Sequence, residues 1–285
     1  MINVGLQVRR AVVEDHQQIA NLMFYEANVH RHLDWRTPLD WLGSPNYWVL
    51  EDGGRIVAGL ACPEDPPQVA WIRLFGYLTH LPAADAWLPL WEAVRATATR
   101  MGQTQIAAIV IKHWFQNLLL ASGFKLAQNI VLLDLRGENF KPFKIPQGVQ
   151  IRTMTAEDIP TVERIDLEAF GGFWHNSHDA LQRARSQAMN ATVAEDSSGV
   201  IVGYQISTGS PFGAHLARLG VVKEAQGKGI GAALVSELVR ELDPKHMARL
   251  SVNTQSDNMA SLALYKKLGF IRTGEHYPVL VYSER

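Results

Sequence analysis

The stretch Gln226-Gly227-Lys228-Gly229-Ile230-Gly231 decides how this chain is organised. It follows an apolar segment, Leu216–Val222, that is typical of a strand, and it opens a helical pattern in which leucines recur at every fourth residue. The alternating glycines leave backbone N–H groups uncovered, and a helix N-terminus adds about half a positive charge at the same place. The stretch therefore predicts a site for an anion such as a pyrophosphate.

Composition and charge narrow the class of protein. The chain has 285 residues, enough for one large domain or two ordinary ones. With 47% hydrophobic and 19% charged residues it can bury a core, and its net charge of −1 gives no reason to expect nucleic acid or a membrane surface as a partner. Neither a signal-peptide core nor an apolar run of about 18 residues occurs, so we expect a cytoplasmic protein.

Metal binding is not expected. Cys62 is the single cysteine, which excludes an intramolecular disulfide and a multi-cysteine zinc site. The histidine pairs His30 with His32 and His175 with His178 lack the further ligands, at suitable spacing, that zinc requires. We therefore predict no metal in the site.

The chain contains an internal repeat. Three pairs of segments match in the same order, at offsets of 143, 144 and 146 residues. The pairs are Val8–Asp15 with Ile151–Asp158, Val49–Asp52 with Val193–Asp196, and Gly123-Phe124 with Gly269-Phe270. The stretch 136–148 between the copies is rich in proline, glycine and basic residues, as linkers are. We predict domains at 1–138 and 149–285, joined by a linker at 139–148.

The second copy has the pattern of an α/β layer fold. A helix is predicted over 155–170, with Thr155 as N-cap and Asp158 three residues later, and Gly171-Gly172 should break it. Further helices are expected at 179–189, after the glycine stretch and at 256–268, and strands at 150–154, 192–194, 200–207, 216–222, 249–253 and 277–282.

Two other phosphate-binding motifs fit the glycine stretch poorly. A dinucleotide site needs glycines at the strand end and an acidic ribose anchor about 20 residues later, whereas Lys223–Gln226 intervene here and the next strand ends in Asn253 and Thr254. A Walker loop needs Gly-Lys-Ser/Thr at the helix start, which is missing. A glycine-rich turn without a ligand remains an alternative.

Two motifs resemble those of the GNAT N-acetyltransferase superfamily. Leu219-Gly220-Val221-Val222 followed by Gln226–Gly231 is similar to its acyl-CoA motif, Gln/Arg-x-x-Gly-x-Gly/Ala, although Lys223 stands where the family often has proline. Asn258–Phe270 resembles its Asn…Ala…Leu-Tyr…Gly-Phe helix. The resemblance covers residues 149–285 and reaches 1–140 only through the repeat. It implies two tandem GNAT-like domains, each an α/β fold with a mixed, mostly antiparallel sheet flanked by helices.

The resemblance also implies that the second copy uses acetyl-CoA as co-substrate. Backbone groups of Leu219, Val221 and Val222 would pair with the pantetheine arm, the N–H groups from Gly227 to Gly231 would hold the pyrophosphate, and Asn258 would lie along the cofactor. The complete predicted set for acetyl-CoA is Leu219, Val221, Val222, Gln226, Gly227, Lys228, Gly229, Ile230, Gly231, Asn253, Asn258 and Ser261.

Tyr265 is the predicted general acid. On a helical wheel it shares one face with Asn258, Ser261 and Leu262, just past the end of a predicted strand. A phenol with an ordinary pKa of about 10 stays protonated at neutral pH and can donate its proton to a departing thiolate. The alternative is a structural tyrosine anchored by its hydroxyl at a helix–sheet seam.

The base is not settled by the sequence. An amine nucleophile must lose a proton to a base or a water relay. Glu168, which precedes the glycine break, and His215, at the start of the central strand, are the two candidates that we carry forward, and Asp166 and Glu195 are further options. For each of them a solvated surface charge is the more common explanation.

The stretch Phe170–His175 combines two glycines with aromatic side chains. It fits a substrate lid, and it fits equally well a group of aromatic residues that cap the core beside a helix break.

The first copy lacks the site. At an offset of 146, His80–Asp85 stand where the glycine stretch should be, with no glycine and with Pro82 lacking an N–H. Leu119 stands in the place of Tyr265. We therefore predict a degenerate first domain and a catalytic second domain.

The predicted reaction is acetyl transfer from acetyl-CoA to a primary amine of a small molecule, by direct attack on the thioester. The alternatives are a protein or peptide N-acetyltransferase and a non-catalytic acyl-CoA-binding regulatory module. The sequence does not name the acceptor, and a homodimer stays open.

Overall fold

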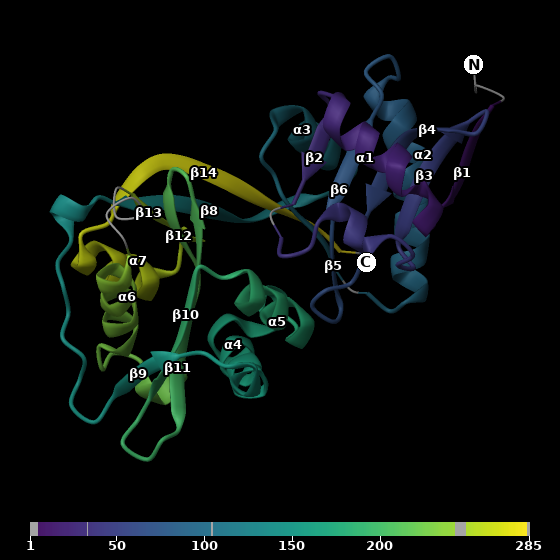
Figure 1. Ribbon diagram of the computed structural model, residues 1–285. Coiled ribbons are helices and arrows are strands. Elements are labelled where there is room, and N and C mark those ends of the chain that lie inside the picture. The colour runs from purple at the N-terminus through teal and green to yellow at the C-terminus, as the bar shows by residue number, and fades with distance from the viewer. Residues whose placement is uncertain (1–4, 33, 104, 243–248, 284–285) are drawn as a thin grey trace. The chain divides into compact units, whose positions relative to one another are not determined.

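The computed structural model describes residues 5–32, 34–103, 105–242 and 249–283 (Figure 1). The chain divides into two compact units. The first unit comprises Met1–Ala127 together with Pro278–Arg285, and the second comprises Gln128–Tyr277. Both are α/β, with mixed and mostly antiparallel strand pairing, so the predicted fold class is confirmed.

The first unit has a five-stranded antiparallel sheet in the order β1-β3-β4-β6-β2, and a second group of strands in which β5 runs parallel to β7. Its strands are β1 (Leu6–Arg10), β2 (Val29–Arg31), β3 (Tyr47–Asp52), β4 (Arg55–Ala61), β5 (Val69–Trp71), β6 (Leu74–Tyr77) and β7 (Gln105–Ile109). Its helices are α1 (His16–Tyr25), α2 (Ala83–Arg100) and α3 (His113–Ala121). Fully buried aromatic side chains, among them Phe75, Trp87 and Phe115, form the centre of the core.

The second unit has its strands in the order β8-β13-β12-β11-β10-β9, and β12 with β13 is the parallel pair among them. The strands are β8 (Lys125–Leu135), β9 (Gln150–Thr153), β10 (Asn190–Glu195), β11 (Ile201–Ser210), β12 (Gly213–Val221), β13 (Leu250–Gln255) and β14 (Ile271–Tyr282). The helices are α4 (Ile159–Trp174), α5 (His178–Gln187), α6 (Ile230–Glu241) and α7 (Met259–Leu268). Helices α4 and α5 cover one face of this sheet, and α6 and α7 cover the other (Figure 1).

Each unit is completed by the last strand of the other sequence copy. Strand β8, at the end of the first copy, pairs with β13, while Val279–Tyr282 of β14 pair with Ile106–Ile109 of β7. The compact units therefore differ from the predicted boundaries at 138 and 149: residues 128–138 belong to the second unit and 278–285 to the first. Local sequence pattern predicts that a strand forms but does not name its partner.

The predicted linker at 139–148 is irregular, and it packs along the second unit. The N–H of Lys141 donates to the carbonyl of Leu268 (3.0 Å), and the N–H of Phe143 donates to Oγ of Ser236 (2.9 Å). Phe143 also packs against the core formed with α6 and α7. This segment therefore contributes to the surroundings of α6 as well as joining the two copies.

The break predicted for α4 is confirmed, and Thr155 is an N-cap, although of the 3-10 turn Ala156–Asp158 that precedes α4 and not of α4 itself. The N–H of Thr155 donates to Oδ2 of Asp158 (2.8 Å), in a short 3-10 turn that leads into the helix. Gly171 interrupts the helical backbone at φ +69°, a conformation that glycine adopts readily, and the chain then continues in helical form to Trp174.

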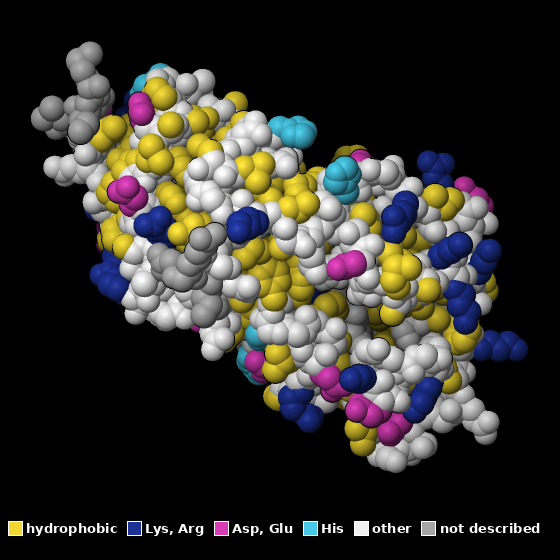
Figure 2. Space-filling model, turned by 180° about the vertical axis from the view of Figure 1, so that it is seen from behind, with side chains coloured by type: hydrophobic (Ala, Val, Ile, Leu, Met, Phe, Trp, Pro, Cys, Tyr) yellow, Lys and Arg dark blue, Asp and Glu magenta, His cyan; other side chains and the backbone are white. Residues whose placement is uncertain are grey.

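The face of the molecule in Figure 2 carries basic and acidic side chains intermingled, in keeping with the net charge of −1. Among the described residues, no helix is both long and apolar enough to cross a lipid bilayer.

Candidate functional site

The glycine stretch forms the turn between β12 and α6. Gly227 (φ +74°) and Gly229 (φ +87°) have left-handed backbones, and Gly229 caps the helix that begins at Ile230. Among the described residues, no backbone hydrogen bond outside the helices and strands is donated by Gly227, Lys228 or Gly229, and Ile230 and Gly231 open α6, where N–H groups have no intrahelical partner. A Cβ added to Gly227 would point into open space, so the backbone is accessible there. Unpaired donors at the positive end of a helix dipole are suited to binding a phosphate group.

Side chains around the turn hold its shape. A Cβ on Gly229 would lie 2.5 Å from Cε1 of Phe143, so the linker packs directly against this glycine. The side chain of Gln226 turns back and donates from Nε2 to the carbonyl of Val221 (3.0 Å). Lys228 is exposed beside these groups. Gln226 therefore stabilises the turn, and its contact with acetyl-CoA stays a prediction.

A gap opens between β12 and β13 just before this turn. The two strands pair only over Ala214–Leu216 with Leu250–Val252. Beyond this, the register between β11 and β12 shifts at Ile206, which leaves Ala217 as a bulge. The remaining part of β12 has no partner on the β13 side among the described residues.

The residues predicted to pair with pantetheine lie along this unpaired edge of β12, and they differ in availability. The N–H of Val222 donates to the carbonyl of Val202 (3.0 Å), and its own carbonyl accepts from the N–H of Ala225 (3.0 Å). Val222 is therefore the least available of the three. Leu219 and the N–H of Val221 are better placed to pair with an extended ligand, although the carbonyl of Val221 already accepts from Gln226.

Tyr265 lies on α7, on the face of the sheet that α6 and α7 cover. It is 4% exposed and shares a core cluster with Leu216 and Val252, the last paired residues before the gap. Burial raises the pKa of its phenol. No hydrogen bond of its hydroxyl is found within the described residues, and this oxygen is not among the fully buried polar atoms that lack a partner, so it is free to donate to a ligand or to water.

The other predicted residues of α7 and β13 have structural contacts. Asn258 is the N-cap of α7, where its Oδ1 accepts from the N–H of Ser261 (3.0 Å). Asn253 is exposed on β13, opposite Leu132 of β8. Their contacts with acetyl-CoA stay predictions.

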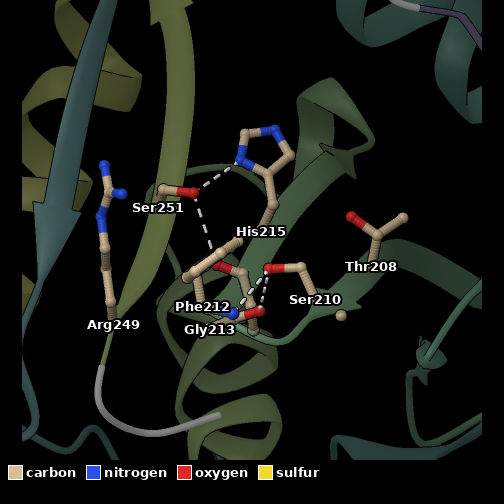
Figure 3. A pocket seen from close by; sticks show the side chains of 9 residues that line it. Thr208, Ser210, Phe212, Gly213, His215, Arg249 and Ser251 are labelled. Carbon is tan, nitrogen blue, oxygen red and sulfur yellow. Dashed lines mark hydrogen bonds between the residues drawn. The ribbon is translucent and has the colours of Figure 1, made fainter.

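His215 lies in a small pocket on the opposite face from Tyr265. Side chains alternate along a strand, so His215 and Ser251 project away from the core that Leu216 and Val252 join. Figure 3 shows the imidazole of His215 directed toward the hydroxyl of Ser251, with a distance of 2.9 Å from Nδ1 to Oγ. Residues of β11, β12 and β13 and the β11–β12 turn line the pocket: Thr208, Gly209, Ser210, Phe212, Gly213, Ala214, His215, Arg249 and Ser251.

The contacts of His215 favour its neutral form with Nε2 unprotonated. Ser251 Oγ donates its hydrogen to the carbonyl of Ala214 (3.3 Å), so it accepts from Nδ1–H of the imidazole. Burial lowers the pKa of His215, and the positive charge of Arg249 lowers it further, while Asp134 opposes both effects. Arg249 is itself paired with Asp134 (2.8 Å).

The carboxylates of the other candidate bases already have hydrogen-bond or ion-pair partners. Oε1 of Glu168 accepts from the N–H of Lys223 (2.5 Å), although the side chain is exposed. Asp166 is completely buried and paired with Arg218 (2.6 Å), and Glu195 is paired with an arginine of β9. Asp166 and Glu195 are thus not surface charges, and each is bound by a guanidinium. Among the described residues, no group of three or more potential metal ligands is brought together.

Sequence reasoning missed the network around Asp166. The guanidinium of Arg218 binds both carboxylate oxygens, at 2.6 and 2.8 Å, and the hydroxyl of Tyr204 donates to the same carboxylate. The signal was its place on the helix: Asp166 lies four residues after Val162, on the apolar face of α4. A charged residue there needs a buried partner.

The second unit is similar to proteins of a known family. A family model described as the Acetyltransferase (GNAT) family matches residues 159–270. A mycothiol acetyltransferase of Amycolatopsis mediterranei is 28% identical over 177 residues, which are 55% of this chain and 58% of the relative. One from Saccharomonospora viridis is 29% identical over 147 residues, 45% of this chain and 47% of the relative. The chain thus spans only about half of the length of these relatives.

A shorter relative is covered more completely, and solved structures agree in fold. The N-alpha-acetyltransferase RimI of Mycobacterium tuberculosis is 31% identical over 132 residues, 45% of this chain and 82% of the relative. A tandem GNAT protein from the clavulanic acid biosynthesis pathway matches 98% of both chains with a TM-score of 0.65 at 18% identity. A GCN5-related N-acetyltransferase from Sphaerobacter thermophilus matches 98% of this chain and 95% of its own, with a TM-score of 0.63 at 15% identity. This chain belongs to the GNAT acetyltransferase family, and its fold is that of a tandem GNAT protein.

Proposed function

We propose that the second unit is an N-acetyltransferase that moves an acetyl group from acetyl-CoA to a primary amine of a small molecule. The observation that carries this proposal is the gap between β12 and β13. It ends at the donors of Gly227–Gly231, and it separates His215 on one face of the sheet from Tyr265 on the other. A thioester in this gap would have a base on the acceptor side and an acid on the thiol side.

His215 and Tyr265 handle separate proton transfers in the proposed reaction. Bound acetyl-CoA supplies an activated acyl carbon. The amine forms its N–C bond to that carbon while Nε2 of His215 accepts the amine proton. The C–S bond breaks, and the hydroxyl of Tyr265 donates its proton to the departing thiolate. Because the pKa of this phenol is raised above 10, well above that of an ordinary thiol, its contribution is greatest while charge develops on sulfur.

His215 fits the role of base better than Glu168. Its Nδ1 is engaged by Ser251, which leaves Nε2 to accept a proton, and its lowered pKa keeps it neutral at pH 7. The carboxylate of Glu168 instead accepts from the backbone at the end of β12. We therefore assign proton abstraction to His215 and give Glu168 a part in holding α4 against β12.

The acceptor class rests on the similarities above. The two relatives from Amycolatopsis mediterranei and Saccharomonospora viridis are named mycothiol acetyltransferases, which favours a small polar amine. The 31% identity to an N-alpha-acetyltransferase keeps a protein or peptide N-terminus as the second candidate. Acetyl-CoA binding without catalysis is the third.

The test is thiol release from acetyl-CoA with a panel of primary amines that includes amino sugars and short peptides with free N-termini. Release with an amino sugar supports the small-molecule acceptor, and release with peptides alone supports the second candidate. If acetyl-CoA raises the unfolding temperature but no amine releases thiol, the protein is a binding module and the proposal is wrong.

Tyr265→Phe tests the acid directly. We expect turnover to fall about 100-fold, since general acid catalysis contributes at least that much, with acetyl-CoA affinity unchanged because the ring remains. Unchanged turnover would remove Tyr265 from the mechanism. Phe270→Leu serves as a control, because it alters the packing around the same ring without touching the hydroxyl.

A further inference from the structure

A buried polar network joins α4 to β12 beside the gap. Asp166 is completely buried, and its carboxylate binds the guanidinium of Arg218 and the hydroxyl of Tyr204. The same carboxylate accepts from the N–H of Asn176 (2.6 Å), and Arg218 donates to the carbonyl of Trp174 (2.6 Å). The network therefore binds both the strand and the chain that follows Gly171.

The segment Phe170–Asn176, which we call the wall, crosses the gap on the side of His215. At its start, the Arg218 guanidinium carbon lies 3.5 Å from the centre of the Phe170 ring. Near its end, Nε1 of Trp174 donates to Oε1 of Gln128 on β8 (2.9 Å). Since β13 lies between β12 and β8 and its pairing with β8 ends at Ile130, a segment bound to β12 and to Gln128 spans the end of β13 and the gap beside it.

The network is not required by the fold. The first unit builds the equivalent strands and helix without it. The strand pairing aligns Arg218 with Leu74 and Tyr204 with Gly59 of the first copy. The helix N-caps align Asp166 with Met23. The copy that has lost the site has also lost the network, which links the network to the site.

We propose that Asp166 is a positioning residue for the acceptor amine: through Arg218 it fixes the wall over the gap, so that the amine is held between the wall and His215. This inference rests on the proposed acetyl transfer for its kinetic consequence. It also makes the wall a fixed surface in place of a mobile lid, because Phe170 at its start and Trp174 and Asn176 near its end all contact the network or β8.

The test compares Asp166→Asn with Asp158→Asn. Asp158 precedes α4 and Asp166 lies within it; both are buried, and both bind an arginine through two carboxylate oxygens. Asp158, however, lies far from the wall in the chain, and its partner is Arg152. For Asp166→Asn we expect the amides of residues 170–176 to exchange hydrogen at least about tenfold faster. The KM for the amine should rise by about 10- to 100-fold, while the KM for acetyl-CoA stays within about threefold of wild type.

Asp158→Asn should change neither the exchange of the wall nor the KM for the amine. Equal effects of the two variants, or unchanged exchange of 170–176 in Asp166→Asn, would overturn the inference. Tyr204→Phe removes one hydrogen bond and no charge, so it provides the same comparison if Asp166→Asn does not fold; we expect a smaller shift in the same direction. If the wild-type protein acetylates no amine, the proposed function fails, and hydrogen exchange still decides whether Asp166 holds the wall.

Discussion

The two copies share an arginine network and differ in everything that resembles a catalytic site. Arg9 binds both oxygens of Asp15 at 2.7 and 2.8 Å and reaches Glu51 on β3 at 2.7 Å. In the second copy, Arg152 binds both oxygens of Asp158 at 2.7 and 2.9 Å and reaches a glutamate of β10 at 2.9 Å. Each arginine ties the first strand of its copy to the turn that starts the following helix, so the repeat preserves what orders the fold.

The proposed general acid, Tyr265, has no counterpart in the first copy. The N–H of Phe270 donates to the carbonyl of Tyr265 (3.0 Å) where a Gly-Phe pair follows the helix. In the first copy the N–H of Phe124 donates to the carbonyl of Leu119 (3.1 Å). Leu119 therefore occupies the position of Tyr265, as predicted, and it is completely buried in the core.

The proposed base and its partner are missing as well. His215 pairs with Ser251 across the parallel strands β12 and β13, and Trp71 pairs with Ala107 across β5 and β7. Both polar side chains of the second copy thus correspond to apolar side chains in the first. The first unit forms the same parallel strand pair without either polar side chain. The fold itself therefore does not require His215 and Ser251.

The turn that corresponds to the predicted anion site is three residues shorter in the first copy. Leu78 and Val222 each donate their N–H to the neighbouring antiparallel strand at equivalent positions. Helix α2 starts at Ala83, five residues after the first of these, whereas α6 starts at Ile230, eight residues after the second. The shorter turn has Pro82 at its N-cap and no glycine. The comparison separates the residues that maintain the fold from those that we assign to the reaction.

The largest effect is expected for the proposed base. His215→Gln should lower turnover by about 100- to 10,000-fold, because it removes the proton acceptor. Ser251→Ala, which introduces the residue of the first copy, should cost about tenfold, because the imidazole stays but loses the partner that orients it. His178→Gln is the control, since this exposed histidine begins α5 and pairs with Glu163 of α4. Equal turnover of His215→Gln and the control would exclude His215 as base.

The pH profile of turnover gives a second measure of the same assignment. His215 acts as base only when it is neutral, so activity should be lost as the pH falls through its pKa. Burial lowers that pKa below the ordinary value of about 6.5, so the loss of turnover should set in at a lower pH than an ordinary imidazole would give. In His215→Gln this acidic limb should disappear. A limb that persists unchanged assigns the titration to another group.

A smaller effect is expected at the glycine stretch. Gly227 and Gly199 have nearly the same backbone, φ +74° and +75°, and a Cβ at either position meets nothing within 4 Å. Alanine at either position should therefore cost similar stability, about 1 kcal/mol. Only Gly227→Ala places a methyl group over the donors of the anion site, so we expect about tenfold weaker acetyl-CoA binding for this variant alone. Calorimetric titration with acetyl-CoA measures it; equal affinities would place the pyrophosphate elsewhere.

Local features of the second copy were the most predictable from the sequence. The Thr155 cap, the break at Gly171 and the glycine turn each depend on neighbouring residues, whose preferences act over one helical turn. The family followed from the same local motifs. The gap itself was not predicted, because it depends on a bulge at Ala217 and on where two distant strands stop pairing.

Non-local partners account for what the sequence could not predict. Asp166 and Arg218 are 52 residues apart, and nothing in the sequence near either residue names the other. The exchange of β8 and β14 between units has the same cause, since each strand has a similar pattern whichever sheet it joins. His215 was a candidate on its position alone, and only the contact with Ser251 shows which ring nitrogen is left to accept a proton.

The smallest effect concerns the shared arginine network and tests whether each copy maintains its own unit. Arg9→Met and Arg152→Met should each cost about 1 kcal/mol of unfolding free energy, a modest amount because both guanidinium groups are partly exposed. Seven of the eight tryptophans lie at or before Trp114, so tryptophan fluorescence reports mainly on the first unit. Arg9→Met should therefore shift the denaturant midpoint seen by fluorescence, and Arg152→Met should shift only the midpoint seen by circular dichroism.

The pH dependence of the Arg152→Met effect follows from Asp158. Hydrogen bonds from Arg152 lower the pKa of this carboxyl below its ordinary value of about 3.9, against the opposing effect of burial. A lowered pKa in the folded state stabilises the protein above the unfolded pKa and ceases to do so as the pH falls through the folded value. The difference between wild type and Arg152→Met should thus be complete at pH 7 and shrink below about pH 4. Identical midpoint shifts by fluorescence and circular dichroism in both variants would show that the two units unfold together. The two copies would then differ only in the residues of the proposed site.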